Sequence, residues 1–247
     1  MGVIEALKKG FNVAVRNPGL VLVIFAFSLI SNLISVRITQ IPVAGRLSAV
    51  GAALQLLIFA ALVVLVDIFL KGGILAGIRD YIKEGKTGLT VFAKYGLKYY
   101  LRLLGLDVVI VAAFAAVILT ALLITSAMML PKIMIIAGAV ALLLAGIGLY
   151  WVILLAAMSP YAVVCEELPV MKALAQSVTI TRKGINKITL LFLITILISL
   201  IWMVVVKVIP VNSQILRAVL AAVFGGYFGI TVSAGFMLLY LSLITNR

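Results

Sequence analysis

The feature that most constrains this chain is a series of uncharged stretches, each long enough to cross a lipid bilayer. A bilayer core about 30 Å thick takes roughly 20 helical residues at about 1.5 Å each. The stretches lack the alternation of a strand, and an open sheet in lipid would leave backbone groups unpaired. They predict six transmembrane helices, at about residues 17–36, 47–70, 104–131, 133–159, 187–208 and 214–245.

Composition agrees with this pattern. Apolar and aromatic residues make up 66% of the chain and charged residues 11%, whereas soluble domains are about half apolar and about a quarter charged. The excess apolar surface must face lipid, so we expect an all-α, polytopic integral membrane protein with one membrane domain over residues 1–247. Abundant Ile, Val, Leu and Lys with little Asn, Gln and Cys is also typical of a thermophile.

The basic residues predict the orientation. If the N-terminus is cytoplasmic, 15 of the 20 lysines and arginines fall in inner segments, as the positive-inside rule requires. The C-terminus is then cytoplasmic too. Lys8, Lys9 and Arg16 precede a long apolar stretch without a small-residue cleavage site, so we expect the first span to be retained.

Three inner segments have the pattern of amphipathic helices lying in the head-group plane. The first has an apolar face opposite Glu5, Lys8, Lys9, Asn12 and Arg16; that face is Ile4, Leu7, Phe11 and Ala14. The second has a basic stripe, Lys94, Lys98 and Arg102, beside Phe92, Tyr95 and Tyr99. The third has Lys172, Gln176 and Thr179 opposite its apolar residues Leu168, Met171, Leu174 and Val178.

The three segments lie about 83 residues apart, judged by Leu7, Val91 and Leu174. This period suggests three units, each an inner helix followed by a transmembrane hairpin, over residues 1–83, 84–166 and 167–247. The first and third segments agree in detail, because Leu7 and Leu174 each follow an alanine and precede a basic residue by nine positions. A chance spacing is the alternative.

The residue types exclude much chemistry. Histidine is absent and Cys165 is the one cysteine, which removes the commonest general base, the Ser-His nucleophile and His-ligated zinc. The chain contains no phosphate-binding loop or metal-ligand motif. We therefore expect no cofactor, no metal and no catalytic residue. The net charge of +13 is spread between apolar spans, which favours anionic lipid head groups over nucleic acid.

Two carboxylates are the candidate intramembrane polar site. Asp67 and Asp107 fall near the inner ends of the second and third spans, where an ionisable group is costly. If they converge, they could bind a cation or share a proton. Alternatively, Asp67 pairs with Lys71 one turn later, and Asp107 occupies the first turn of a helix.

Other patterns have both structural and functional interpretations. Glu166 and Glu167 precede Pro169 and suggest a helix start. The pairs Gly73/Gly77 and Gly225/Gly229 permit close helix packing. The stretch from Gly225 to Gly229 could instead be a flexible point that lines a cavity. The residues predicted to contact anionic lipid are Lys94, Lys98, Arg102, Arg182, Lys183 and Lys187.

Residues 159–184 resemble a family. The stretch SPYAVVCEE, followed by MKALAQS and then RKG, is similar to the superfamily of the glycerophosphodiester phosphodiesterase membrane domain and its uncharacterised prokaryotic relatives. The matching residues are Pro160, Glu166, Ala173, Leu174, Ser177 and Arg182. The resemblance implies a membrane module of a prokaryotic cell membrane. It implies no catalytic residue, because catalysis in the phosphodiesterases belongs to a separate soluble domain.

Three functions are open. The first is a non-catalytic protein that organises lipids or a membrane partner, including a second copy of itself, through a basic cytoplasmic face. The second is a small transporter or channel that uses Asp67 or Asp107. The third is a lipid-modifying enzyme, which the absence of histidine disfavours.

Overall fold

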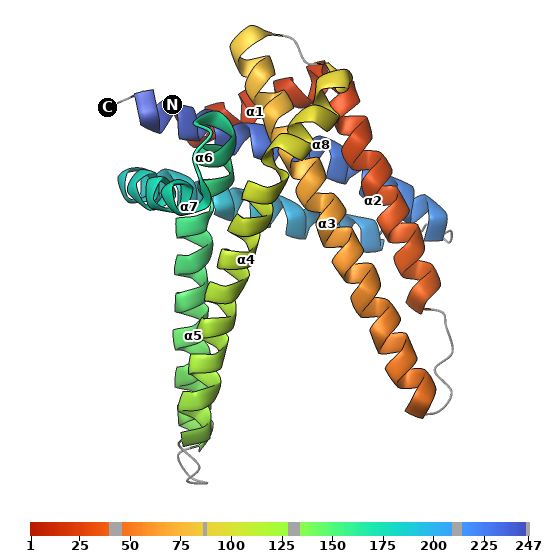
Figure 1. Cartoon of the computed structure of the whole chain (residues 1–247), viewed down its shortest axis with the longest axis vertical. Coiled ribbons are helices and arrows are strands. Elements are labelled where there is room, and N and C mark those ends of the chain that lie inside the picture. Colours follow the sequence, from red (N-terminus) through yellow and green to blue (C-terminus); the bar gives the residue numbers. More distant parts are fainter. Residues whose placement is uncertain (40–45, 86–87, 128–133, 209–213, 246–247) are drawn as a thin grey trace. The chain divides into compact units, whose positions relative to one another are not determined.

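The computed structural model describes residues 1–39, 46–85, 88–127, 134–208 and 214–245, and the regular elements in these ranges are all helices (Figure 1). The all-α prediction is thereby confirmed for the described part of the chain. The helices are α1 (Val3–Arg16), α2 (Pro18–Thr39), α3 (Arg46–Glu84), α4 (Leu89–Ala127), α5 (Met134–Ala156), α6 (Ser159–Cys165), α7 (Val170–Val208) and α8 (Gln214–Thr245).

Length and apolarity agree with a membrane-embedded chain. In the described ranges, five helices are long and apolar enough to cross a membrane, or six if the bent pair α1 and α2 counts as one. That pair turns by 87° between Arg16 and Pro18. In the most apolar window of Ala53–Glu84 only 6% of residues are buried, against 44% in Ile215–Thr245. Most spanning surface is therefore left for lipid.

Two helices are longer than predicted. α3 continues past the expected end at residue 70 to Glu84, and α4 begins at Leu89 rather than near residue 104. The basic stripe of α4 therefore belongs to the same uninterrupted helix as the third span. Neither stretch contains a proline, and glycine alone costs a helix only about 1 kcal/mol. Gly184 does break the helical geometry of α7, with φ −118° and ψ 22°.

The chain forms two compact units, residues 1–100 with 186–247 and residues 101–185. In the first unit, α8 lies against α1, α2 and α3. The closest approach is at Gly10 of α1, where an added Cβ would lie 2.3 Å from the carbonyl oxygen of Thr231. No side chain fits there, so the two backbones meet at this glycine.

Phenylalanine rings pack on glycines where α3 meets the start of α4. Phe92 covers Gly73, and Phe69 covers Gly96; an added Cβ at either glycine would lie 2.6 Å from the ring. The two rings contact each other edge-on with centroids 6.1 Å apart. Each ring thus occupies the space that a missing side chain leaves on the neighbouring helix.

The predicted glycine pairs are packing positions, and Gly229 also lines a hollow between α2, α3 and α8. Gly77 lies under Leu20, while Gly225 and Gly229 are in ordinary contact with Ser28 and Ile24 of α2. The tighter position on α8 is Gly226, where an added Cβ would lie 3.0 Å from the carbonyl oxygen of Val21.

In the second unit, α4 and α5 pack at Val117 and Gly148. Its buried residues gather at the end that contains α6 and the start of α7; they include Leu103, Leu106, Leu154, Met158, Val163 and Ala173. The remainder of α4 and α5 has exposed apolar side chains, such as Leu123 and Leu142. The packed part of this unit therefore lies at one end of its two long helices.

Candidate functional site

Asp67 lines a hollow in the first unit. The hollow has a volume of about 170 Å³ and lies between α2, α3 and α8. Its polar residues are Asp67, Lys71 and Ser233, and Ile24 and Phe27 contribute to its apolar wall. The Asp67 side chain is exposed and that of Lys71 is half-buried. Both charges of the predicted i, i+4 pair thus face one small amphipathic hollow.

Asp107 lies in the second unit, half-buried on α4. It is 18 residues beyond the start of that helix at Leu89, so its explanation as a first-turn residue is wrong. Helix-dipole stabilisation acts only within the first turn. Each aspartate is described within its own unit, and their convergence stays a prediction.

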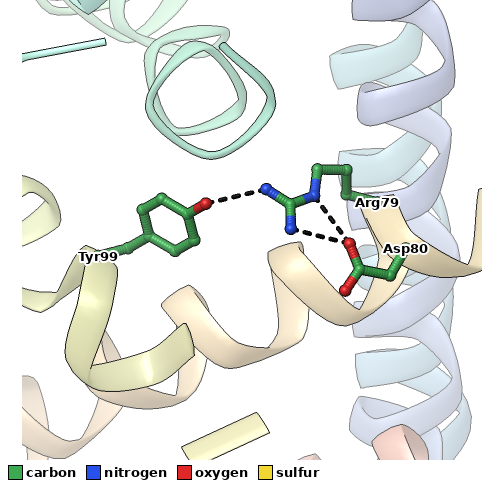
Figure 2. Close-up of polar contacts among 3 residues, drawn as sticks. All are labelled: Arg79, Asp80 and Tyr99. Atoms are coloured by element: carbon green, nitrogen blue, oxygen red, sulfur yellow. Dashed lines mark hydrogen bonds and ion pairs between the residues drawn. The ribbon is translucent and has the colours of Figure 1, made fainter. Parts of the chain in front are cut away.

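A polar cluster fastens α3 to α4, and the sequence analysis missed it (Figure 2). The Arg79 side chain is buried; it donates from Nε to Asp80 Oδ1 at 2.9 Å and from Nη1 to the Tyr99 hydroxyl at 2.9 Å. Its guanidinium lies 5.1 Å from the centre of the Tyr95 ring. An arginine cannot lose its charge, so burial requires such partners. The neutral, hydrogen-bonded arrangement serves as an anchor between helices.

The inner helix α1 has three faces. Its small residues pack against α8, and its charged residues are exposed; the buried side is Val3, Ala6, Gly10, Val13 and Ala14. The side chains of Ile4, Phe11 and Val15 are also exposed, by 77%, 55% and 52%. Ala14, expected with Ile4 and Phe11, therefore belongs to the packed side. The Lys9 ammonium, 2.8 Å from Glu5, lowers the pKa of that carboxyl by hydrogen bonding and by charge.

The start of α7 is arranged like α1. Ala173, Ser177, Ile180 and Thr181 are buried, and Met171 is 71% exposed. On α4, the exposed residues Leu97 and Leu101 flank the basic stripe. The three segments predicted to be amphipathic thus each place exposed apolar and charged residues beside buried ones.

The predicted lipid-contacting residues differ in their surroundings. The side chains of Lys94, Lys98, Arg182, Lys183 and Lys187 are exposed. Arg102 is half-buried, and its Nη1 donates to the carbonyl oxygen of Glu167 at 2.6 Å. Arg102 therefore has a structural contact within the second unit, between α4 and the loop before α7.

The family-like residues meet where α5 ends. Pro160 has no N–H for the carbonyl of Ala156, and the Ser159 hydroxyl donates to that oxygen instead. The Ser177 hydroxyl donates to the carbonyl of Leu155 and accepts from the Met158 N–H at 3.2 Å. Thr181, which the sequence analysis did not single out, donates to the carbonyl of Leu154 at 3.2 Å. Hydroxyls thus satisfy three successive carbonyls that the helix break releases.

Of the remaining motif residues, three lie on α7 and Glu166 is hydrogen-bonded to that helix. Ala173 is fully buried on α7, Leu174 beside it is half-buried, and Gln176 Nε2 donates to Glu166 Oε1 at 3.3 Å. Glu166 follows α6 as its C-cap residue, so it ends that helix, whereas the sequence suggested that it starts the next. Pro169 does precede α7, and its carbonyl accepts the N–H of Ala173 at 2.9 Å.

Among the described residues, no group of three or more His, Cys, Asp or Glu side chains could hold a metal ion. Comparisons of the chain with protein-family models, with curated proteins and with solved structures find no match.

Proposed function

We propose that the protein is a non-catalytic membrane module that organises anionic lipids, or a membrane partner, through a basic cytoplasmic face. The observation that carries the proposal is the exposed side of α1, where Ile4, Phe11 and Val15 stand beside Lys8 and Lys9. A helix with apolar and basic residues directed outward binds at the lipid interface, with the apolar side chains below the head groups. The packed face of α1 fixes it to α8 and presents the other faces to the bilayer.

The exposed lysines of α4 extend this face. Lys94 and Lys98 project from the same helix as Leu97 and Leu101, an arrangement that suits the boundary between head groups and chains. The proposal places both termini in the cytoplasm of a prokaryotic cell. It includes three sequence repeats, each an inner helix followed by a transmembrane hairpin. The matching burial of Ala6 and Ala173 supports these repeats. It also includes membership of the phosphodiesterase membrane-domain superfamily, which rests on the resemblance of residues 159–184.

Lipid selectivity tests this function. The protein is reconstituted with spin-labelled phosphatidylglycerol or phosphatidylcholine, and the motionally restricted fraction of each lipid is measured by electron paramagnetic resonance. We expect phosphatidylglycerol to be preferred, and the preference to fall when salt rises from about 0.05 to about 0.5 M, because screening shortens the range of the charges. Lys94→Gln with Lys98→Gln should lower the preference about thirtyfold, at about 1 kcal/mol for each of the two basic residues near an anionic surface.

Arg217→Gln is the matched control, because Arg217 is exposed and belongs to the opposite, outer side in the predicted topology. It should leave the inner-face selectivity unchanged. Equal binding of the two lipids, or a preference unaffected by salt, would contradict the proposed function.

A small transporter is the second candidate, because Asp67 and Lys71 of α3 and Ser233 of α8 line one hollow among the helices. Asp67→Asn abolishing ion flux in proteoliposomes would support it. Unchanged flux would remove Asp67 from any transport mechanism.

A further inference from the structure

The hollow of the first unit combines opposite charges with apolar walls. Asp67 and Lys71 lie one turn apart on α3, and Ser233 faces the same space from α8. The walls are Ile24, Phe27 and Leu70. Its volume of about 170 Å³ is below the roughly 300–1,000 Å³ of sites for drug-sized ligands. The hollow therefore suits a small polar group attached to an apolar chain.

The charges select the polar group. An anionic head group would be attracted to Lys71 but repelled by Asp67, and a purely cationic ligand would meet the reverse. A zwitterion presents its ammonium to the carboxylate and its phosphate to the lysine, so both charges are met at once. The ammonium matters at the level of Asp67, because a carboxylate near hydrocarbon is stabilised by a cationic group that donates hydrogen bonds to it.

The hydrogen-bonding groups narrow the choice further. A primary ammonium donates three hydrogen bonds, which the Asp67 carboxylate and the Ser233 hydroxyl can accept. A choline head group has no N–H to donate, and its three methyl groups take more space. Phosphoethanolamine is thus the common head group that matches this lining best.

We propose that the hollow between α2, α3 and α8 binds the head group of a phosphatidylethanolamine-type lipid, with the ammonium at Asp67 and Ser233 and the phosphate at Lys71. The start of an acyl chain lies along Ile24, Phe27 and Leu70. The inference goes beyond the proposed function, which concerns anionic lipid at the exposed lysines, and each can fail without the other.

Native mass spectrometry of the full chain, released from nanodiscs, tests the inference. Equal mixtures of phosphatidylethanolamine, phosphatidylcholine and phosphatidylglycerol are supplied, and the lipid that stays bound is identified. We expect one phosphatidylethanolamine to be retained about tenfold over phosphatidylcholine, as the charge-assisted hydrogen bonds of one ammonium allow. Asp67→Asn should remove this preference, and Lys71→Gln should reduce it.

Two variants keep the result interpretable. Asp107→Asn alters the other predicted intramembrane carboxylate, in the second unit, and should leave the retained lipid unchanged. Ser233→Ala, which removes only a hydroxyl, should lower the preference about threefold and serves if Asp67→Asn does not fold.

Equal retention of phosphatidylethanolamine and phosphatidylcholine would overturn the inference, as would an Asp67→Asn protein that folds and keeps the preference. Soluble phosphoethanolamine that binds as tightly as the lipid would also overturn it, because the apolar wall would then contribute nothing. Loss of the phosphatidylglycerol preference in the Lys94/Lys98 variant, with phosphatidylethanolamine still retained, would separate the two proposals.

Discussion

Helix α1 and the start of α7 each meet the backbone of a longer helix, in two different ways. In the first unit, Gly10 of α1 brings its backbone against Thr231 of α8. In the second unit, Ser177 of α7 places its hydroxyl between Leu155 and Met158 at the end of α5. The two positions would correspond in the proposed repeat: Gly10 and Ser177 are separated by 167 residues, as are Ala6 and Ala173, which are both fully buried.

The difference follows from the condition of the partner helix. α8 runs unbroken from Gln214 to Thr245, so the carbonyl of Thr231 has its helical partner and α1 needs only to come close. α5 ends at Ala156, and two residues separate it from α6, which contains Pro160, so its last carbonyls need donors. Gly10 therefore contacts its partner helix without a side chain, whereas Ser177 contacts its partner through a hydroxyl.

The largest effect should come from filling the glycine contact. Gly10→Leu places a side chain where even a Cβ lies 2.3 Å from a backbone oxygen, and we expect a loss of about 3 kcal/mol as α1 leaves α8. Reversible unfolding in mixed micelles measures the loss. Gly146→Leu is the control, because an added Cβ at Gly146 meets nothing within 4 Å; equal losses would contradict the backbone contact.

Removing the Ser177 hydroxyl should destabilise the protein less than filling the contact at Gly10. Ser177→Ala leaves the carbonyl of Leu155 and the N–H of Met158 without this partner, and we expect a loss of about 2 kcal/mol for the buried groups. Thr179→Val is its control on the same helix, because Thr179 is exposed and donates only to Ala175, one turn back. A Ser177→Ala protein as stable as the parent would show that the junction is held by packing alone.

Tyr99→Phe removes the hydroxyl that accepts a hydrogen bond from Arg79 in the first unit. We expect the free energy of unfolding to fall by about 1.5 kcal/mol, the value of a hydrogen bond to a charged group. Arg79 keeps its ion pair with Asp80, but both residues lie on α3, so the variant loses the Arg79 hydrogen bond to α4. The packing of Phe92 on Gly73 remains, and we expect α3 and α4 to stay in contact but to separate more easily. Hydrogen exchange of the amides around Arg79 should accelerate. Tyr100→Phe alters a half-buried neighbour and should leave the exchange rates unchanged.

The smallest contrast compares two adjacent glycines of α8. Gly226→Ala should destabilise by about 1 kcal/mol, because its Cβ would press on the carbonyl of Val21 at 3.0 Å. Gly225→Ala, with its Cβ 3.7 Å from Ser28 Oγ, should be neutral or stabilising, since alanine is the better helix former. The reverse order would place the seam at Gly225 and Gly229, as the spacing alone suggested.

Long apolar stretches made the helical membrane class predictable, and the sixth stretch matches α8 closely. The full lengths of α3 and α4 were harder to predict, because Lys71 and Arg102 each border an uncharged run without ending a helix. Charge marks the edge of hydrocarbon, whereas helix ends depend on breaks such as Pro160 and Gly184. Arg79 was counted only as one cation among many, because its partner Tyr99 lies 20 residues away and nothing local distinguishes the pair.

The hydroxyl junction illustrates the same limit. Ser177 was singled out by resemblance, but Thr181 was not, and neither residue indicates from sequence that it faces a broken helix. Ser177 and Thr181 lie one turn apart on α7, and this spacing indicates a shared partner only when the end of α5 is known to pack against that turn. Asp67 could be proposed from its cost in lipid, whereas its companions Ser233 and Phe27 come from distant helices.

Orientation is the claim on which the basic face, the packed inner ends and the lipid proposals depend. Single cysteines are introduced as Lys98→Cys and Arg217→Cys in a chain carrying Cys165→Ser, and intact cells are treated with an impermeant thiol reagent. We expect Arg217→Cys to be labelled from outside and Lys98→Cys to be labelled only after the cells are opened. Labelling of Lys98→Cys in intact cells would contradict the predicted orientation.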